Sequence, residues 1–475
     1  MTETLWTLAG LTRASGGTQD GSSTIALTGF SIDTRTLKAG DIFVALKDQR
    51  DGHDFVTSAF AKGAGAALVS AAYERKPGDG ALVRVAETLS GLESVARAAR
   101  ARLSPAARVI GVTGSVGKTG TKEMLKACLS LVAPGRVHAA DKSFNNHWGV
   151  PLTLASMPAD ILFGVFEIGM NHAGEITPLT KLVRPHVALI TTVEAVHLEH
   201  FASVEDIAEA KSEIFLGLEP GGTAIINRDN PHFAVMDQRA RIAGRTVCSF
   251  GLSDGADVRP SRWELGPEGS DITVRLSGRD VTYRVAAPGA HIAQNSLAVV
   301  AAIDAAGAHA GTASQALAQL HAPQGRGSRT TLRTPSGDIL LIDESYNANP
   351  ASMSSALAAM ATVPRESFGR RVAVLGDMLE LGQESAALHA GLVLALCRSG
   401  VDLVFLSGPQ MSHLNAVLPE AMRGGWAINS SEIREPLLTA LRPGDAVMIK
   451  GSNGSRMAPL VEAVKEKFAV ISGSE

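Results

Sequence analysis

A glycine-rich stretch, GVTGSVGKTGTKE from Gly111 to Glu123, constrains this chain more than any other part of it. Residues 107–112 before it are typical of a short buried strand, and residues 119–132 after it carry apolar side chains at helical spacing. A glycine-rich turn between a strand and a helix is the setting of a phosphate-binding loop, because backbone N–H groups and the helix dipole attract phosphate oxygens. We expect Lys118 to supply charge for the terminal phosphates and Thr119 to place its hydroxyl on Mg²⁺.

The loop departs from the usual P-loop pattern, which has four residues between its first glycine and the Gly-Lys pair. Val112 stands where that first glycine would be, and the nearest glycines are Gly111 and Gly114. The stretch is therefore a variant loop, Thr-Gly-x-x-Gly-Lys-Thr. An ordinary strand–helix turn with a surface lysine is the alternative, but the flanking elements and the Lys-Thr pair favour phosphate binding.

Composition limits the class of protein. The chain has 475 residues, 45% of them hydrophobic and 19% charged, which is a globular composition with room for roughly three domains. Its net charge of −3 gives no basic field for nucleic acid or membrane, and no apolar stretch reaches the roughly 20 residues of a membrane span. Three widely spaced cysteines indicate a reducing compartment, and the first ten residues do not read as a signal peptide. We therefore expect a cytoplasmic protein.

Alternating strand and helix signals predict an α/β protein. Residues 1–106 read as a small α/β domain, residues 107–322 as a central domain around the glycine-rich loop, and residues 323–475 as a further domain of repeated βα units. The last two should each hold an open, mostly parallel sheet. In such sheets the ligand crevice lies at the carboxyl ends of the strands, so polar residues that follow strands are the candidates for function.

In the first of these units two polar runs adjoin predicted strands. Thr34 and Arg35 follow Asp33, and Asp51 precedes Gly52 and His53. Asp and Gly favour turns whatever their function, so a turn and a ligand site remain equal readings of both runs.

The central unit carries three candidates for metal binding. Glu167 lies near the end of the apolar run 161–169, where an unpaired charge is costly, so it is a metal ligand or half of a buried ion pair. His197 follows the strand predicted at 187–193, and on its own it reads as a surface residue. Lys211 lies in the helix predicted at 203–218, where a solvated lysine is the simplest interpretation. Asn145 and Asn146 stand before Gly-Val-Pro, in a fixed loop that is either functional or only turn-forming.

The third unit begins after PQGRGSR at residues 323–329, which we interpret as a linker with two arginines, Arg326 and Arg329. The strand at 339–342 is followed by DESYNANP, the strand at 371–375 by GDMLELG, and the strand at 446–449 by Lys450-Gly-Ser. Polar loops after three strands of one sheet predict a second half of the site at its carboxyl edge.

Taken in order, these motifs resemble the Mur ligases, the ATP-dependent amide ligases of peptidoglycan precursor synthesis. The resemblance covers nearly the whole chain, and it is greatest to the ligases that add D-alanyl-D-alanine to UDP-N-acetylmuramoyl-tripeptide. Its most specific parts are YNANP at 346–350 and LGDMLELG at 375–382. It implies an N-terminal domain for the UDP sugar, a central ATPase and a C-terminal Rossmann-like domain.

The resemblance also implies roles for individual residues. The residues that it assigns to ATP are Thr113, Gly114, Ser115, Val116, Gly117, Lys118, Thr119, Gly120, Asn295, Asp343 and a linker arginine, for which we favour Arg326. The residues that it assigns to two Mg²⁺ ions are Thr119 and Glu167 for one, and His197 and a carbamylated Lys211 for the other. Catalysis would rest on Lys118, Lys211, His197, Asn145 and Asn146. The residues expected to contact the other substrates are Thr34, Arg35, Asp51, His53, Tyr346, Asn347, Asn349 and Lys450.

The implied reaction has two steps. The terminal carboxylate of the tripeptide attacks the γ-phosphorus of ATP to give an acyl phosphate and ADP, and the amine of D-alanyl-D-alanine then displaces phosphate. Two anions must approach each other in the first step, so Lys118 and Mg²⁺ are needed to neutralise the developing charge. The expected partners are these small molecules alone, with the chain acting as a monomer that closes on binding.

One departure from the family concerns residues 47–50. A glycine usually follows the family's Phe-x-Ala-Leu strand, and Lys47-Asp-Gln-Arg stands there instead, so the contacts of this loop with the sugar nucleotide are in doubt. Two other functions remain to be distinguished. A sister ligase or folylpolyglutamate synthetase would share the chemistry but use another amine, and a non-catalytic homologue would bind ATP alone. A P-loop kinase or GTPase would leave two further α/β domains unexplained.

Overall fold

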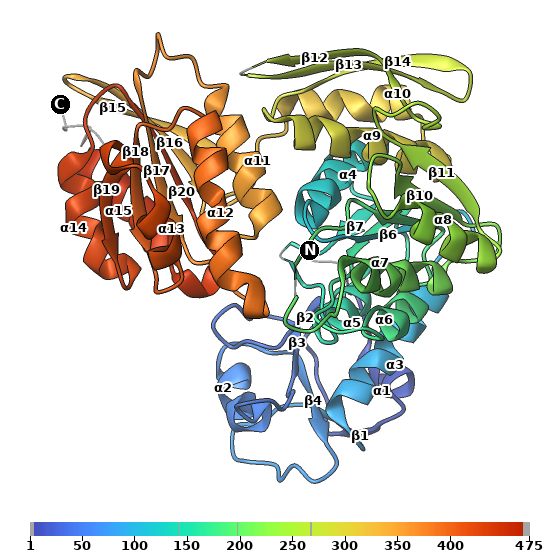
Figure 1. Ribbon diagram of the computed structural model, residues 1–475. Helices are drawn as coiled ribbons and strands as arrows, with labels where there is room; N and C mark the ends of the chain where they lie inside the picture. Colours follow the sequence, from blue (N-terminus) through green and yellow to red (C-terminus); the bar gives the residue numbers. More distant parts are fainter. Residues whose placement is uncertain (1–3, 142, 197, 267, 469–475) are drawn as a thin grey trace.

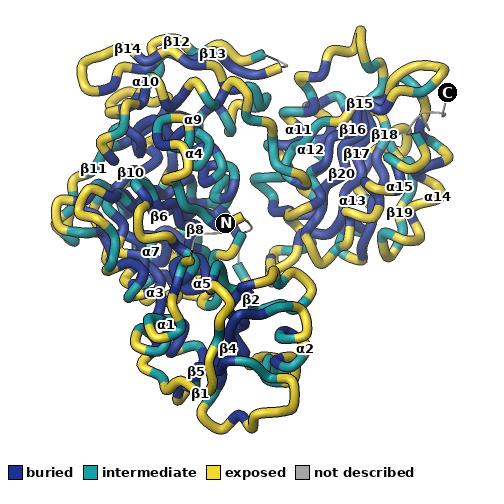
Figure 2. Tube along the Cα trace, turned by 180° about the vertical axis from the view of Figure 1, so that it is seen from behind, coloured by how far each residue is buried: buried dark blue, intermediate teal, exposed yellow. Residues whose placement is uncertain are grey.

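The computed structural model describes residues 4–141, 143–196, 198–266 and 268–468. Three layered units carry one large sheet each, coloured blue, cyan to green and orange to red along the chain in Figure 1. Burial is concentrated in the strands of these sheets, while the outer loops are exposed (Figure 2). The predicted α/β class with mostly parallel sheets is confirmed.

The N-terminal sheet has the order β1-β5-β4-β3-β2, with β1 antiparallel to β5 and the other neighbours parallel. Its strands are β1 (Thr18–Asp20), β2 (Gly29–Ser31), β3 (Asp41–Val44), β4 (Ala66–Ser70) and β5 (Leu82–Val85). Its helices are α1 (Leu8–Ser15), α2 (Val56–Ala61) and α3 (Thr88–Ala101).

The central sheet is parallel throughout, in the order β11-β10-β9-β6-β8-β7. Its strands are β6 (Arg108–Thr113), β7 (Val137–Ala139), β8 (Phe163–Glu167), β9 (Val187–Ile190), β10 (Thr223–Asn227) and β11 (Thr246–Phe250). The helices around it are α4 (Lys118–Val132), α5 (Gly149–Ala155), α6 (Ile176–Val183), α7 (Val204–Ser212), α8 (Phe233–Ile242), α9 (Ala290–Ala305) and the short α10 (Ala310–Ala313). Because all six strands run the same way, the loops after them meet at one edge.

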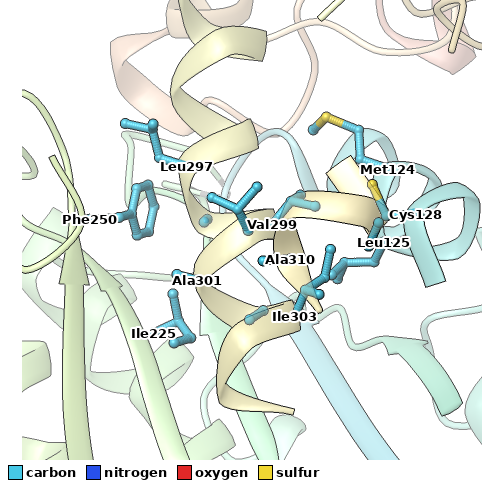
Figure 3. Close-up of a cluster of buried hydrophobic side chains, with 14 of the residues drawn as sticks. Met124, Leu125, Cys128, Ile225, Phe250, Leu297, Val299, Ala301, Ile303 and Ala310 are labelled. Carbon is cyan, nitrogen blue, oxygen red and sulfur yellow. The ribbon is translucent and has the colours of Figure 1, made fainter. Parts of the chain in front are cut away.

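Helix α9 is the centre of the largest apolar core. It is apolar on nearly all sides because it packs on α4 and on the sheet from below, and three antiparallel strands cover it from above. Figure 3 shows side chains of α9 such as Leu297 and Ile303 between Met124 and Leu125 of α4 and the strand residue Phe250. The covering strands are β12 (Pro260–Gly266), β13 (Gly269–Leu276) and β14 (Arg279–Val285).

Helix α3 joins the N-terminal and central units through a shared core. Its residues Leu92, Val95 and Ala99 pack in one cluster with Leu152 and Ala155 of α5. The indole of Trp6 donates a hydrogen bond of 2.9 Å to the Ala155 carbonyl, and the Arg102 guanidinium lies 4.1 Å above the indole ring. These two units are therefore packed as one body.

The C-terminal sheet has the order β15-β16-β20-β17-β18-β19, parallel except for β15. Its strands are β15 (Ser328–Thr334), β16 (Gly337–Glu344), β17 (Arg370–Gly376), β18 (Leu403–Ser407), β19 (Arg423–Ala427) and β20 (Asp445–Lys450). Its helices are α11 (Pro350–Ala361), α12 (Ser385–Arg398), α13 (Met411–Val417), α14 (Ser430–Ala440) and α15 (Ala458–Phe468). Across the described residues, none of the helices combines the length and the apolar composition that a membrane span requires.

Sequence patterns missed several strands, among them the edge strands β12 and β15, and they missed a break in one helix. Strand β12 reads as polar because it lies at the rim of its sheet, and β15 buries only Leu332, so neither shows an apolar alternation. The predicted linker consequently ends earlier, since Ser328 and Arg329 already belong to β15. The helix predicted at 203–218 is α7 followed by a 3₁₀ turn at Glu213–Gly217.

We expect Leu297→Ala to destabilise the fold, because Leu297 is fully buried between α9 and the sheet. A buried leucine truncated to alanine costs about 2–5 kcal/mol, so the urea midpoint followed by circular dichroism should fall clearly. The matched control is Leu394→Ala, whose side chain on α12 is 61% exposed. Equal midpoints for the two variants would contradict the core described here.

Candidate active site

The carboxyl edges of the central and C-terminal sheets face one cavity of about 550 Å³. Both sheets contribute to its wall, together with the chain segment that connects them. Residues that line it from the central part include Lys118, Thr119, Asn145, Glu167 and Asn295. Residues that line it from the later part include Arg326, Tyr346, Asn347, Asn349 and Lys450. The structure thus brings together most of the predicted ATP residues and the predicted dipeptide residues.

Two glycines let neighbouring side chains approach the backbone of the glycine-rich loop closely. Gly114 and Gly117 have φ of 146° and 86°, which side chains rarely adopt. A Cβ on Gly114 would lie 1.9 Å from the Thr191 hydroxyl, and one on Gly117 would lie 2.6 Å from the Asn295 side-chain amide. Both glycines are therefore required by conformation and by space, and Asn295 lies directly against the loop.

Backbone contacts with the segment after β9 hold the loop in place. The Ser115 N–H donates to the Thr192 carbonyl at 2.8 Å, and the Thr191 hydroxyl donates to the Val116 carbonyl at 2.6 Å. The Ser115 hydroxyl in turn accepts from the Glu194 N–H at 2.9 Å. Helix α4 begins at Lys118, directly after the loop, so its free N–H groups and positive dipole end face the cavity.

Lys118 is the cation of the loop. Its ammonium donates to the carbonyls of Gly114 at 2.6 Å and Ser115 at 3.3 Å. Burial lowers the pKa of Lys118, the carboxylate of Glu167 opposes that shift, and the positive charge of Arg326 adds to it. Two cations therefore converge on this part of the cavity, which suits an anionic ligand.

Glu167 stands at the end of β8 and is only 2% exposed. One carboxylate oxygen accepts from the Thr119 hydroxyl at 2.8 Å, and the other accepts from the Asn145 amide at 2.8 Å. The Thr119 hydroxyl also lies 3.1 Å from that of Ser143. Strand β8, helix α4 and the loop before α5 thus bring one carboxylate and two hydroxyls together, and these are hard oxygen donors of the kind that Mg²⁺ prefers.

Lys211 is not the solvated lysine that its helix suggested. Its side chain is 1% exposed on the inner face of α7, and no hydrogen-bond acceptor for its ammonium is found within the described parts of the chain. Burial, reinforced by the charge of Lys118, lowers the pKa of Lys211 well below its ordinary value. His197 lies outside the described residues.

Residues 323–329 connect the central and C-terminal sheets, and one of the two arginines in this segment points into the cavity. The guanidinium of Arg326 lies 4.0 Å above the Tyr346 ring and donates to the Ser143 hydroxyl at 3.3 Å. Arg329 instead donates to the Ala359 carbonyl of α11 at 3.4 Å and does not line the cavity. Asp343 is also absent from the lining, because its carboxylate accepts from the Gly325 N–H and the Ser345 hydroxyl.

The YNANP loop is fixed from two sides. Asn349 caps α11 by accepting from the Ser352 N–H at 2.8 Å, within a reciprocal capping box. Lys450 at the end of β20 is 2% exposed and donates to the Glu344 carboxylate at 3.1 Å and to the Asn347 carbonyl at 3.0 Å. Lys450 is therefore an ion-paired support at the cavity wall, and Glu344 is a lining residue that the sequence did not single out.

Other predicted residues lie elsewhere. Asn146 lies three residues before α5 and accepts from the N–H groups of Trp148 and Gly149, so its side chain stabilises the turn that leads into this helix. Asp51 accepts from both the backbone and the ring of His53, while the second ring nitrogen of His53 accepts from the Ser70 N–H at 2.9 Å. Arg35 is 85% exposed and ion-paired to Asp33. These three residues of the N-terminal unit, with Thr34, do not line the cavity.

Several lining residues were missed from sequence. The cavity wall also includes Ser143, Glu123, Glu194, His291, Gln294 and Thr191. Ser143 could have been found, since it adjoins the two asparagines, but a lone serine carries no pattern. Within the described ranges, no group of three or more His, Cys, Asp and Glu side chains is arranged to hold a metal ion. A cation here would therefore depend on the Thr119–Glu167 pair together with ligand oxygens.

Comparisons with known proteins agree with this geometry. Residues 112–303 match the family model of the Mur ligase middle domain, and residues 328–453 match that of the Mur ligase glutamate ligase domain. The chain is 36% identical to UDP-N-acetylmuramoyl-tripeptide–D-alanyl-D-alanine ligase of Escherichia coli K12, over 97% of this chain and 98% of that one. It resembles the crystal structure of MurF from Acinetobacter baumannii with a TM-score of 0.83, at 29% identity, covering 97% and 99% of the two chains.

A further solved relative bears on the ligand. The chain resembles MurF ligase of Thermotoga maritima in complex with ADP with a TM-score of 0.75, at 25% identity, over 93% of this chain and 98% of that one. Identity above 30% along nearly the full length, with matches to both family models, establishes the relationship. This chain belongs to the Mur ligase family.

Proposed function

We propose that this protein joins D-alanyl-D-alanine to UDP-N-acetylmuramoyl-tripeptide in an ATP-dependent reaction, forming the pentapeptide precursor of peptidoglycan. The observation that carries the proposal is one cavity with a phosphate loop on one wall and the YNANP loop with Lys450 on the other. The ligase names of relatives such as that of Escherichia coli support the same reaction.

We propose that the three substrates divide among three domains, at residues 1–106, 107–322 and 323–475. The UDP sugar would bind the N-terminal domain, ATP the central one and the dipeptide the C-terminal one. The shared cavity then becomes the place where the tripeptide carboxylate, the γ-phosphate and the incoming amine meet. Holding these three groups together accounts for much of the rate enhancement, because the substrates then react within one complex and need not meet in solution.

ATP is the nucleotide that the loop fits, and the ADP complex of the Thermotoga maritima relative supports this assignment. The tripeptide carboxylate attacks the γ-phosphorus, the bond to the β-phosphate oxygen breaks, and ADP leaves. The amine then forms the amide bond by attacking the acyl carbon, losing a proton as phosphate departs. Lys118 and Arg326 attract the phosphates and offset the negative charge that both steps gather in the cavity.

Mg²⁺ fits the residues present at the loop. Thr119 and Glu167 would hold the ion, since the Thr119 hydroxyl oxygen and a Glu167 carboxylate oxygen lie 2.8 Å apart at the N-terminus of α4. When bound, the ion would neutralise phosphate charge as a Lewis acid. His197 remains a predicted ligand of a second ion, outside the described residues.

We further propose that Lys211 carries a carbamate. Its lowered pKa favours the neutral amine, whose lone pair can form a bond to the carbon of CO₂ with loss of a proton. The product is an anion with two oxygen donors. Carbamylation would therefore give Lys211 a negative charge near Lys118, where a positive charge on Lys211 is disfavoured.

The amine substrate that the enzyme requires distinguishes the proposed function from that of a sister ligase. We expect phosphate release from ATP to require both UDP-N-acetylmuramoyl-tripeptide and D-alanyl-D-alanine, with the pentapeptide product detected by mass spectrometry. Release that needs the tripeptide but a different amine would assign the chain to a sister reaction. Absence of release with any pair would favour a non-catalytic homologue.

Lys118→Ala should lower turnover by about a hundredfold or more, because it removes a positive charge of the cavity wall that stabilises the transition state. The measurement is the rate of ADP formation at saturating substrates, with an unchanged thermal unfolding midpoint as the folding check. The control is Lys181→Ala, which changes an exposed lysine of α6 outside the cavity. Activity in Lys118→Ala equal to that of the control would refute the role of Lys118.

Lys211→Ala should be inactive and should recover part of its activity when formate or acetate is supplied, because a small carboxylate can take the place of the carbamate. Intact-protein mass spectrometry at neutral pH in bicarbonate should also show one added CO₂ in the wild type and none in the variant. Full activity of the variant without added carboxylate would contradict the carbamate.

A further inference from the structure

A chain of hydrogen bonds crosses the cavity from one sheet toward the other. Ser143 lies between β7 and α5, and its hydroxyl is 3.1 Å from that of Thr119 and 3.3 Å from the Arg326 guanidinium. Thr119 continues the chain to Glu167 at 2.8 Å. Ser143 is therefore the link between the phosphate loop and the segment that leads into the C-terminal sheet.

The chemistry of the side chains fixes which group donates in each hydrogen bond of this series. A guanidinium only donates, a carboxylate only accepts, and each hydroxyl has one proton to give. Thr119 gives its proton to Glu167, so it must accept from Ser143, and Ser143 must accept from Arg326. Every bond then points the same way, and neighbouring bonds in such a chain strengthen one another.

The backbone on either side of Arg326 is held independently. Gly325 and Gly327 have φ of 76° and 93°, and their N–H groups donate to the side chain and the carbonyl of Asp343. The guanidinium itself rests on the Tyr346 ring. Among the described residues, Ser143 is the hydrogen-bond acceptor that Arg326 finds in the central unit.

We propose that Ser143 is a positioning residue that aims Arg326 at the phosphates and so couples ATP on the central sheet to the YNANP loop that carries Tyr346. The inference deepens the proposed function and rests on it, because the coupling has a purpose only in an enzyme that joins substrates held by the two sheets. Ser143 itself needs no contact with substrate for this role.

Ser143→Ala should lower kcat about tenfold, the factor expected for loss of one hydrogen bond to a charged group. The KM for UDP-N-acetylmuramoyl-tripeptide should stay unchanged, since the side-chain hydrogen bonds that Ser143 makes with described residues go to Thr119 and Arg326 and not to the N-terminal unit. Ser143→Thr keeps the hydroxyl and should restore most of kcat. The matched control is Ser94→Ala on α3, whose hydroxyl bonds only within its own helix.

A double-mutant cycle decides whether Ser143 acts through Arg326. If it does, Ser143→Ala should add little to the loss already caused by Arg326→Ala, in kcat and in the equilibrium affinity for a non-hydrolysable ATP analogue measured with EDTA. Losses that multiply would overturn the proposal. A loss of affinity that appears only with Mg²⁺ would also overturn it, because Ser143 would then act as a cation ligand.

The affinity cycle also separates the two hypotheses. If the wild type forms no pentapeptide, the proposed function fails, yet coupling between Ser143 and Arg326 in analogue binding is still measurable. If the wild type is active and the cycle is additive, the function stands and the role of Ser143 fails. Thermal unfolding midpoints of all variants show whether a loss reflects misfolding.

Discussion

The proximity of Lys118 to the fully buried Lys211 is the constraint on which the carboxyl edge of the central sheet depends, because the charge of Lys118 disfavours a second positive charge on Lys211. Lys118 and Lys211 come from different helices, and burial together with their mutual charge lowers the pKa of Lys211. The glycine-rich loop holds the partly buried Lys118 at the cavity wall through the carbonyls of Gly114 and Ser115, and the segment after β9 holds the loop. Such an arrangement is unfavourable by itself and becomes favourable when an anion enters. The fold thus maintains a positively charged site that an anionic ligand neutralises when it binds.

Sequence patterns were most informative where chemistry and chain geometry coincide. The phosphate loop was predicted because strand, glycines, Lys118 and helix follow one another without interruption, and Glu167 because a charge at the end of an apolar strand needs a reason. The parallel arrangement of the sheets followed from alternating βα signals. Membership of the Mur ligase family, inferred from the order of the motifs, is confirmed.

One error was avoidable from the sequence, whereas the other gaps depend on contacts between distant segments. Lys211 lies four residues after Ile207 and three after Ala208, both fully buried, so helical periodicity does place it on the apolar face of α7, and a lysine there was wrongly assigned to solvent. The choice between Arg326 and Arg329 needed the position of α11, and the role of Asp343 needed the fold of the connecting segment. Asp51 and His53 bond to each other, and His53 also accepts from the Ser70 N–H, while their predicted role in substrate binding stays a prediction.

The packing of α3 has a consequence for how the protein is made. Apolar residues of the N-terminal unit complete their core only with Leu152 and Ala155 of α5, which come from well inside the central unit. On the ribosome, where domains generally fold in order of synthesis, the first hundred residues of this chain must wait for α5 to emerge before that surface is covered. All six strands of the C-terminal sheet, in contrast, come from the uninterrupted stretch between Ser328 and Lys450. The nascent chain therefore has one early segment that depends on a later one, and a final segment that contains everything its own sheet requires.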